Sequence, residues 1–338
     1  MPFLFSYRST ASSALHHAIG MVLLAVSLIA SPALAAPATN AALNLASSSA
    51  LVLDNESGKV LYGKNAEAVV PIASITKLMT AMVVLDADLD PNEQLVVSND
   101  DVDWLRGSHS RMQVGFALSR DEMLRIALMA SENRAASALG RHYPGGRPAF
   151  VAAMNAKAHD LGLQGTRFSD STGLSSTNVS TAEDLARMVR AAHEYPKIRE
   201  YSTLSNFSVM AGGRPLAFRN TNGLVMSPDW EIGLSKTGFI NEAGRCLVMQ
   251  ATLAGRAVVI VLLDSWGRYT RTADAARIRK WLEIAGGYIA EPKARVAAAR
   301  TAAKTKATAA RTKSTATAAR AKPTPRVSVQ MRAPAPTL

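Results

Sequence analysis

The chain has 338 residues, enough for one large or two ordinary domains with a sizeable core. Its only cysteine, Cys246, excludes an internal disulfide and lies in an apolar run, so we expect it to be packed. The formal net charge is +12, but residues 291–338 hold 11 Lys and Arg against one acidic residue, and Arg8 adds one more charge. About +1 remains for the rest, so the basicity belongs to a tail and does not characterise the domain.

The first 35 residues have the form of a secretory signal peptide. Arg8 precedes an apolar run over residues 18–30, and residues 33–35 (Ala-Leu-Ala) make a small-x-small cleavage site. The run is shorter than the roughly 20 residues of a bilayer-spanning helix, so we favour cleavage over a membrane anchor. We therefore expect an exported, periplasmic protein, soluble or peripherally attached to the membrane, with residues 36–48 as a linker.

Residues 289–338 form a basic tail rich in Ala, Lys, Arg, Thr and Pro. It has almost no large apolar residues and cannot bury enough surface to fold, so we predict disorder. Such tails bind polyanions, but export argues against nucleic acid as the physiological partner. Anionic lipid or wall polymers are better candidates, and a merely solvated tail is the alternative.

Residues 49–288 show the patterns of one α+β domain. Strand patterns occur near both of its ends, at 50–54, 59–62, 245–252 and 256–263. Helix patterns fill the middle and close the domain, at 74–85, 123–129, from 133 onward, 148–161, 181–195 and 270–284. This order predicts an antiparallel sheet formed from both ends of the domain, with a central helical subdomain.

Three short motifs carry polar side chains suited to acyl transfer: Ser74-Ile75-Thr76-Lys77, Ser131-Glu132-Asn133 and Lys236-Thr237-Gly238. Taken singly, each also fits ordinary helix caps and strand ends, and Ser176-Thr177-Asn178 matches the second pattern as well. The order and spacing raise their significance. The second motif follows 57 residues after the first at a helix junction, and the third follows 105 residues later, before the C-terminal hairpin.

This arrangement resembles the serine D-Ala-D-Ala peptidases and the β-lactamase-like enzymes. The flanking residues are similar to the low-molecular-mass D-alanyl-D-alanine endopeptidases of the penicillin-binding protein 7 type, over residues 50–286. The segments that carry the resemblance are 71–80, 129–136, 219–222 and 236–239. It implies a β-lactamase/transpeptidase-like fold, peptidoglycan as the substrate, β-lactam antibiotics as covalent inhibitors, and no cofactor or metal.

Ser74 is the candidate nucleophile, because a serine hydroxyl attacks a carbonyl once a neighbouring base takes its proton. None of the six histidines lies in a recognisable motif, which leaves Lys77 as the base. Lys77 must be neutral to act, and we expect burial and the charge of Lys236 to lower its pKa. Ser131 would relay the proton to the leaving amine.

The remaining candidates are expected to bind substrate: Asn133, Lys236, Thr237, Gly238 and Phe239. Asn133 would hydrogen-bond the substrate or Lys77. Lys236 and Thr237 would orient the peptide, and the positive charge of Lys236 would attract a carboxylate. The resemblance implies an oxyanion hole formed by the N–H groups of Ser74 and Phe239. Glu132 lies between Ser131 and Asn133 in the sequence, and no catalytic or binding role is expected of it.

Four activities compete for this site. An endopeptidase would cut D-alanyl-meso-diaminopimelyl cross-links, and a carboxypeptidase would remove terminal D-Ala through the same acyl-enzyme. A class A β-lactamase would need a glutamate for deacylation, but the segment 165–181 holds only Asp170 and no Glu. A silent wall-binding protein would show a broken motif, and none is broken. We favour the endopeptidase.

Overall fold

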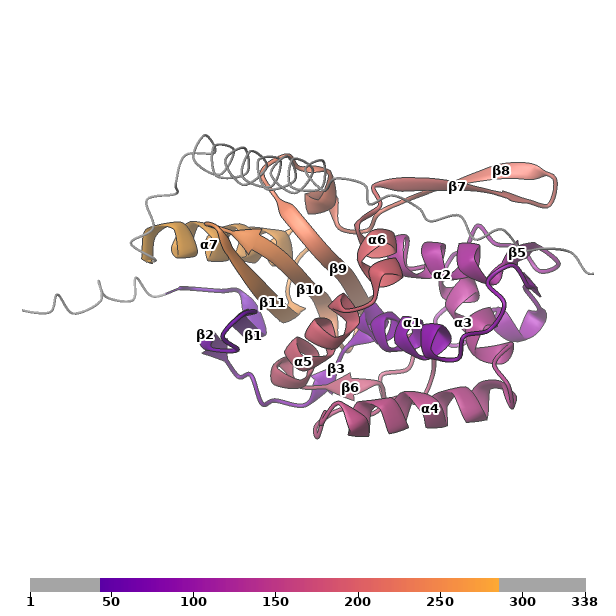
Figure 1. The fold of residues 1–338 in the computed structure, drawn as a ribbon, viewed down its shortest axis with the longest axis horizontal. Coiled ribbons are helices and arrows are strands. Elements are labelled where there is room, and N and C mark those ends of the chain that lie inside the picture. Colours follow the sequence, from indigo (N-terminus) through magenta and orange to yellow (C-terminus); the bar gives the residue numbers. More distant parts are fainter. Residues whose placement is uncertain (1–42, 286–338) are drawn as a thin grey trace, which may run out of the picture. The chain divides into compact units, whose positions relative to one another are not determined.

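The central sheet takes its strands from both ends of the domain (Figure 1). The computed structural model describes residues 43–285. The strands are β1 (Ser47–Asp54), β2 (Val60–Lys64), β9 (Glu231–Ile240), β10 (Gly244–Leu253) and β11 (Arg256–Ser265), in the antiparallel order β2-β1-β11-β10-β9. β1 pairs with β11 from Ser47 opposite Ser265 to Asp54 opposite Val258. The predicted α+β fold is confirmed, whereas the predicted signal peptide and basic tail lie outside the described residues.

Both faces of the sheet are covered by helices, which explains the near-continuous apolar runs in β10 and β11. Successive residues of a strand point to opposite faces. Leu247 and Met249 pack with α7 (Thr270–Ala285), whereas Val248 belongs to the larger core that includes α5 (Ala182–His193). Figure 1 shows these two helices on opposite sides of the sheet.

The helical part surrounds one central helix, α1 (Lys77–Asp86), which packs against five other α-helices. Those neighbours are α2 (Arg120–Met129), α3 (Asn133–Arg141), α4 (Gly146–Asp160), α5 and α6 (Pro196–Thr203). Eight consecutive residues of α1, from Lys77 to Val84, are therefore buried. This enclosure takes the amine of Lys77 out of water.

Several elements differ from the sequence expectation. The helix predicted from Ser74 begins as a 3₁₀ turn, η1 (Ala73–Thr76), and α1 starts only at Lys77. The helix expected over 181–195 ends at His193, and Pro196 occupies the first turn of α6, where proline lacks only a hydrogen bond that no helix makes there. The hairpin of β7 (Asn206–Ala211) and β8 (Arg214–Arg219) was not predicted, and it projects beside α2 in Figure 1.

Smaller elements complete the fold. They are the pair β3 (Val70–Pro71) and β6 (Val179–Ser180), the pair β4 (Gln94–Val96) and β5 (Ala117–Ser119), and the short helices η2 (Asn99–Asp101) and η3 (Gly223–Met226).

The fully buried carboxylate of Asp101 ties η2 to the helices. It accepts a hydrogen bond from Ser137 at 2.8 Å and pairs with Arg141 at 2.8 Å and Arg147 at 3.1 Å. Asp101→Asn is expected to lower the free energy of unfolding by about 2–4 kcal/mol, because two arginines lose their anion. Urea titration measures the loss. Asp100→Asn, an exposed neighbour, is the control, and equal stability of the two variants would contradict the prediction.

Candidate active site

The amine of Lys77 lies at the centre of a buried polar cluster. Its Nζ donates hydrogen bonds to Ser74 Oγ at 3.0 Å, Asn133 Oδ1 at 2.8 Å and the carbonyl of Thr172 at 2.6 Å. The amide Nδ2 of Asn133 in turn donates to Ser108 Oγ at 3.0 Å. The first two predicted motifs are thus brought together across α1 and α3, and Lys77 is in hydrogen-bonding reach of the serine hydroxyl.

The third motif lies against the second. Lys236, on β9, donates from Nζ to Ser131 Oγ at 2.9 Å and to the carbonyl of Thr237 at 2.9 Å. Ser131 has a φ of 59°, which is uncommon for a residue with a Cβ and turns the chain between α2 and α3. Ser131 is therefore held between the helical part and the sheet.

β9 runs directly beside the turn that holds Ser74. A Cβ placed on Gly238 would lie 2.9 Å from the carbonyl oxygen of Ile72 and 3.2 Å from the backbone nitrogen of Ser74. Only a glycine allows this approach without displacement of the backbone. The strand that follows Lys236 and the first turn before α1 thus form two walls of one site.

Gly173 closes the same turn from the other side. A Cβ there would lie 2.0 Å from the carbonyl oxygen of Ala73 and 2.9 Å from the Ser74 nitrogen, and the residue has a φ of 80°. We expect Gly173→Ala to lower the free energy of unfolding by about 3 kcal/mol or more and to slow acylation of Ser74.

A matched control separates the clash from the backbone conformation. Gly162 has a φ of 68°, and a Cβ there would meet nothing within 4 Å. Gly162→Ala should cost only about 1–2 kcal/mol, measured by urea unfolding, and should leave acylation unchanged. If the Gly173→Ala and Gly162→Ala variants were equally stable and equally reactive, the proposed close packing around Ser74 would be wrong.

The electrostatic surroundings of Lys77 favour its neutral form. Burial lowers the pKa of Lys77 to about 8, although the charges of Asp170 and Glu132 raise it. Burial likewise pushes the pKa of Lys236 well below its ordinary value, and the positive charges of Lys77 and Arg271 lower it further. The expected lowering by burial is therefore present at Lys77, whereas the expected repulsion with Lys236 lowers the pKa of Lys236 and not that of Lys77.

The other predicted residues on β9 line the same edge. Thr237 is buried and donates from Oγ1 to Thr221 Oγ1 at 2.6 Å. Phe239 is half exposed, and the guanidinium of Arg245 lies 4.5 Å from the centre of its ring. All eight predicted site residues thus lie along this one junction of η1, α1, α3 and β9.

The sequence did not indicate that the 169–178 loop accepts a hydrogen bond from Lys77, through the carbonyl of Thr172. Asp170 organises this loop, since its carboxylate accepts hydrogen bonds from the backbone nitrogens of Thr172, Gly173 and Ser175. The Asp-Ser-Thr-Gly composition is a turn signal, but it does not reveal that a carbonyl of the turn points at a lysine 95 residues away.

Two other residues resolve ambiguities in the motifs. The carboxylate of Glu132 accepts hydrogen bonds from Ser110 and from the backbone nitrogens of Arg134 and Ala135, so it caps α3. Asn178, in the second Ser-x-Asn match, is fully buried and holds the 169–178 loop together, with its Nδ2 3.2 Å from Thr76 Oγ1. That match is structural.

The position of Arg271, on α7, close to the site was also not predicted from the sequence. Its Nη1 donates to the carbonyls of Gly238 at 3.0 Å and Cys246 at 3.1 Å, so a guanidinium lies behind the Lys236-Thr237-Gly238 strand. Cys246 is fully buried, as predicted. Within residues 43–285, no group of three or more His, Cys, Asp or Glu side chains is placed to hold a metal ion.

A serine paired with a buried lysine, set between a helical subdomain and an antiparallel sheet, is the arrangement of serine peptidases that use lysine in place of histidine. Residues 35–266 match the D-alanyl-D-alanine carboxypeptidase family. The chain belongs to this family.

Individual relatives agree with this assignment. The chain is 51% identical over 273 residues to a D-alanyl-D-alanine endopeptidase of Pseudomonas aeruginosa, which covers 78% of this chain and 88% of the relative. It is 48% identical over 253 residues to the Escherichia coli D-alanyl-D-alanine endopeptidase, covering 74% and 81%. The crystal structure of a Streptomyces DD-transpeptidase superposes with a TM-score of 0.65 at 29% identity, covering 70% of this chain and 97% of that one.

Proposed function

We propose that this protein is a serine endopeptidase that hydrolyses D-alanyl-meso-diaminopimelyl cross-links in peptidoglycan through an acyl-enzyme on Ser74. One observation carries the proposal: the contact of Lys77 Nζ with Ser74 Oγ, in a chain about half identical to D-alanyl-D-alanine endopeptidases. Peptidoglycan is accordingly the proposed substrate, and no cofactor enters the reaction.

In the acylation step, neutral Lys77 takes the proton of Ser74 Oγ while that oxygen attacks the carbonyl carbon of D-alanine. The N–H groups of Ser74 and Phe239 stabilise the developing oxyanion, each by about 3 kcal/mol. The close approach of Gly238 to the Ser74 nitrogen supports this role, since it brings the backbone of β9 next to the backbone of η1.

Collapse of the tetrahedral intermediate breaks the amide bond, and the leaving amine of diaminopimelate needs a proton. Ser131 relays to it the proton that Lys77 took from Ser74, while Lys236 donates to Ser131 Oγ, so that Ser131 is protonated and Lys77 neutral again before deacylation. Water then attacks the ester on Ser74, with Lys77 as the general base, and releases the D-alanyl product. Asn133 holds Lys77 in position, and Thr237 and Lys236 orient the peptide.

Removal of terminal D-Ala is the second candidate, because the matching family is described by that activity and relatives named carboxypeptidases are 31% identical to this chain. Digestion of purified cross-linked muropeptide dimers separates the two. The proposal expects monomers to appear. Release of terminal D-Ala with the cross-links left intact would overturn the endopeptidase assignment in favour of the carboxypeptidase.

β-Lactam antibiotics are the proposed covalent inhibitors. The segment 165–181 offers only Asp170 as a carboxylate, and that side chain is occupied by the backbone of its own loop. We therefore propose that the penicilloyl ester on Ser74 turns over slowly. Rapid catalytic hydrolysis of benzylpenicillin would contradict this.

We place the enzyme outside the cytoplasm, where peptidoglycan lies, and in the periplasm through the signal peptide inferred in residues 1–35. No helix within residues 43–285 is long and apolar enough to cross a membrane. The basic tail from residue 289 is proposed to contact anionic lipid or wall polymers. Deletion of the tail should then weaken binding to anionic vesicles or to wall sacculi, and unchanged binding to both would leave it as a solvated segment.

A further inference from the structure

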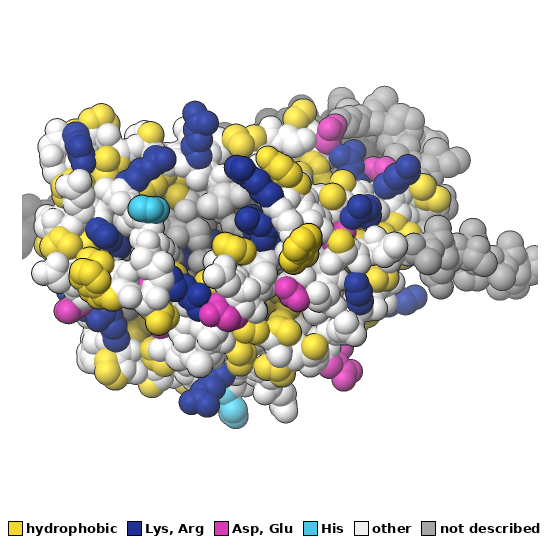
Figure 2. Space-filling view, turned by 180° about the vertical axis from the view of Figure 1, so that it is seen from behind, with side chains coloured by type: hydrophobic (Ala, Val, Ile, Leu, Met, Phe, Trp, Pro, Cys, Tyr) yellow, Lys and Arg dark blue, Asp and Glu magenta, His cyan; other side chains and the backbone are white. Residues whose placement is uncertain are grey.

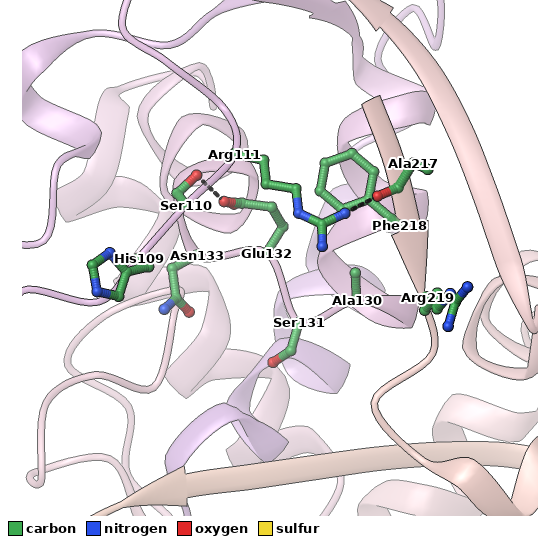
Figure 3. Close-up of a pocket in the computed structure, with 10 residues that line it drawn as sticks. All are labelled: His109, Ser110, Arg111, Ala130, Ser131, Glu132, Asn133, Ala217, Phe218 and Arg219. Atoms are coloured by element: carbon green, nitrogen blue, oxygen red, sulfur yellow. Dashed lines mark hydrogen bonds between the residues drawn. The ribbon is translucent and has the colours of Figure 1, made fainter. Parts of the chain in front are cut away.

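A pocket of about 550 Å³ adjoins the Ser131–Asn133 segment (Figure 3). Its other walls are the 109–111 loop and the end of β8 at 217–219. Ser131 and Asn133 belong both to this pocket and to the candidate active site. A ligand lying in the pocket is therefore continuous with the reacting centre.

Arginine side chains line the pocket without acidic partners. Arg111 donates from Nη1 to the carbonyl of Ala217, and Figure 3 shows its guanidinium in the middle of the group, between Glu132 and Ala217. Among residues 43–285, neither Arg111 nor Arg219 forms an ion pair. Glu132 is the one acidic lining residue, and its carboxylate is bound by Ser110 and by the first turn of α3.

This local charge is not a property of the whole domain. Residues 43–285 keep about +1 of the +12 once the tail and Arg8 are set aside. Figure 2 shows Lys and Arg side chains dispersed over one face of the molecule among apolar and neutral ones. Two guanidinium groups without an acidic partner among the described residues, in a pocket that Ser131 and Asn133 also line, therefore point to an anionic part of the substrate.

We propose that this pocket is a carboxylate-binding subsite, in which Arg111 and Arg219 hold a free carboxylate of the peptidoglycan stem peptide beside the bond that is cleaved. The inference rests on the proposed function. Stem peptides of this type carry free carboxylates on D-glutamate and on diaminopimelate. Arginine recognises such groups through two parallel N–H···O bonds, and the volume lies in the range of ordinary ligand pockets.

The test compares three muropeptide dimers with the full-length enzyme: one with all carboxylates free, one amidated at diaminopimelate and one amidated at D-glutamate. We expect Arg111→Gln and Arg219→Gln each to lower kcat/KM for the free-carboxylate dimer about 10- to 100-fold. Amidation of the carboxylate that the arginines bind removes its charge, so on that dimer the decrease in kcat/KM caused by each substitution should be about threefold or less. The dimer that shows this smaller decrease identifies the bound carboxylate.

Arg214→Gln is the matched control, because this exposed arginine lies on the same hairpin but outside the pocket lining. Its kcat/KM should stay near the wild-type value on every dimer. No loss in the Arg111 and Arg219 variants, or an equal loss on all three dimers, would overturn the subsite alone. A wild-type enzyme that is acylated by penicillin yet cleaves none of the dimers would overturn the proposed function and the subsite with it.

Discussion

Ser74→Ala is expected to abolish cleavage of cross-linked muropeptides, with a loss of roughly 10⁴- to 10⁶-fold, because the acyl-enzyme cannot form without the hydroxyl. Stability should change little. The Ser74 side chain is half-buried, and Lys77 keeps its hydrogen bonds to Asn133 and to the carbonyl of Thr172. Thermal unfolding of the variant measures this directly.

The control for Ser74 is Ser176→Ala, in the second Ser-x-Asn match of the sequence. We expect this variant to retain full cleavage and full labelling by fluorescent penicillin. Undiminished cleavage by the Ser74→Ala variant would show that the chemistry lies elsewhere in the chain.

The acylation rate is expected to rise with pH because Lys77 must be neutral to accept a proton. With its pKa lowered to about 8, the neutral fraction increases about tenfold for each pH unit below 8 and levels off above it. The second-order rate of acylation by a penicillin, followed from about pH 5.5 to 9.5, should show this inflection. A flat profile, or a rate that still rises about tenfold per pH unit up to about pH 9.5, as the ordinary lysine value of 10.5 would give, would contradict the assignment of Lys77 as base.

Two variants sharpen the assignment of Lys77. Lys77→Met keeps an apolar chain of similar length but no base, and should slow acylation by about 10²- to 10⁴-fold. Glu132→Gln removes a negative charge that raises the pKa of Lys77, so the inflection should move to lower pH. A shift to higher pH, or no shift, would show that Glu132 does not act on the titration of Lys77.

The sheet and most helices could be predicted because their signals are local. The apolar runs of β10 and β11 are nearly continuous, and α5 lies within the helix predicted over 181–195. The β7–β8 hairpin could not be predicted in this way. The two strands of this hairpin have no long apolar run. Buried and exposed residues alternate along them, so that only one face of the hairpin is buried.

The site was predictable in its residues but not in its contacts. Ser74 and Lys77 are close in sequence, so their pairing follows from one helical turn. The bond from Lys236 to Ser131 spans 105 residues, and the bond from Lys77 to Thr172 spans 95. Only the tertiary packing of β9 and of the 169–178 loop against α1 and α3 determines these pairs.

The charge balance at Lys77 also needed the structure. The motif predicts a base whose pKa is lowered by burial, but no spacing rule reveals that Asp170 and Glu132 lie near enough to oppose that lowering. The pKa of about 8 results from burial outweighing two carboxylates. This balance keeps a useful neutral fraction of Lys77 near neutral pH.

Mass spectrometry of the intact protein after incubation with benzylpenicillin tests the central claim most directly. We expect one covalent penicilloyl adduct per chain, mapped by digestion to the peptide that contains Ser74 and lost in the Ser74→Ala variant. An adduct on any other peptide, or no adduct on a folded wild-type protein, would contradict it.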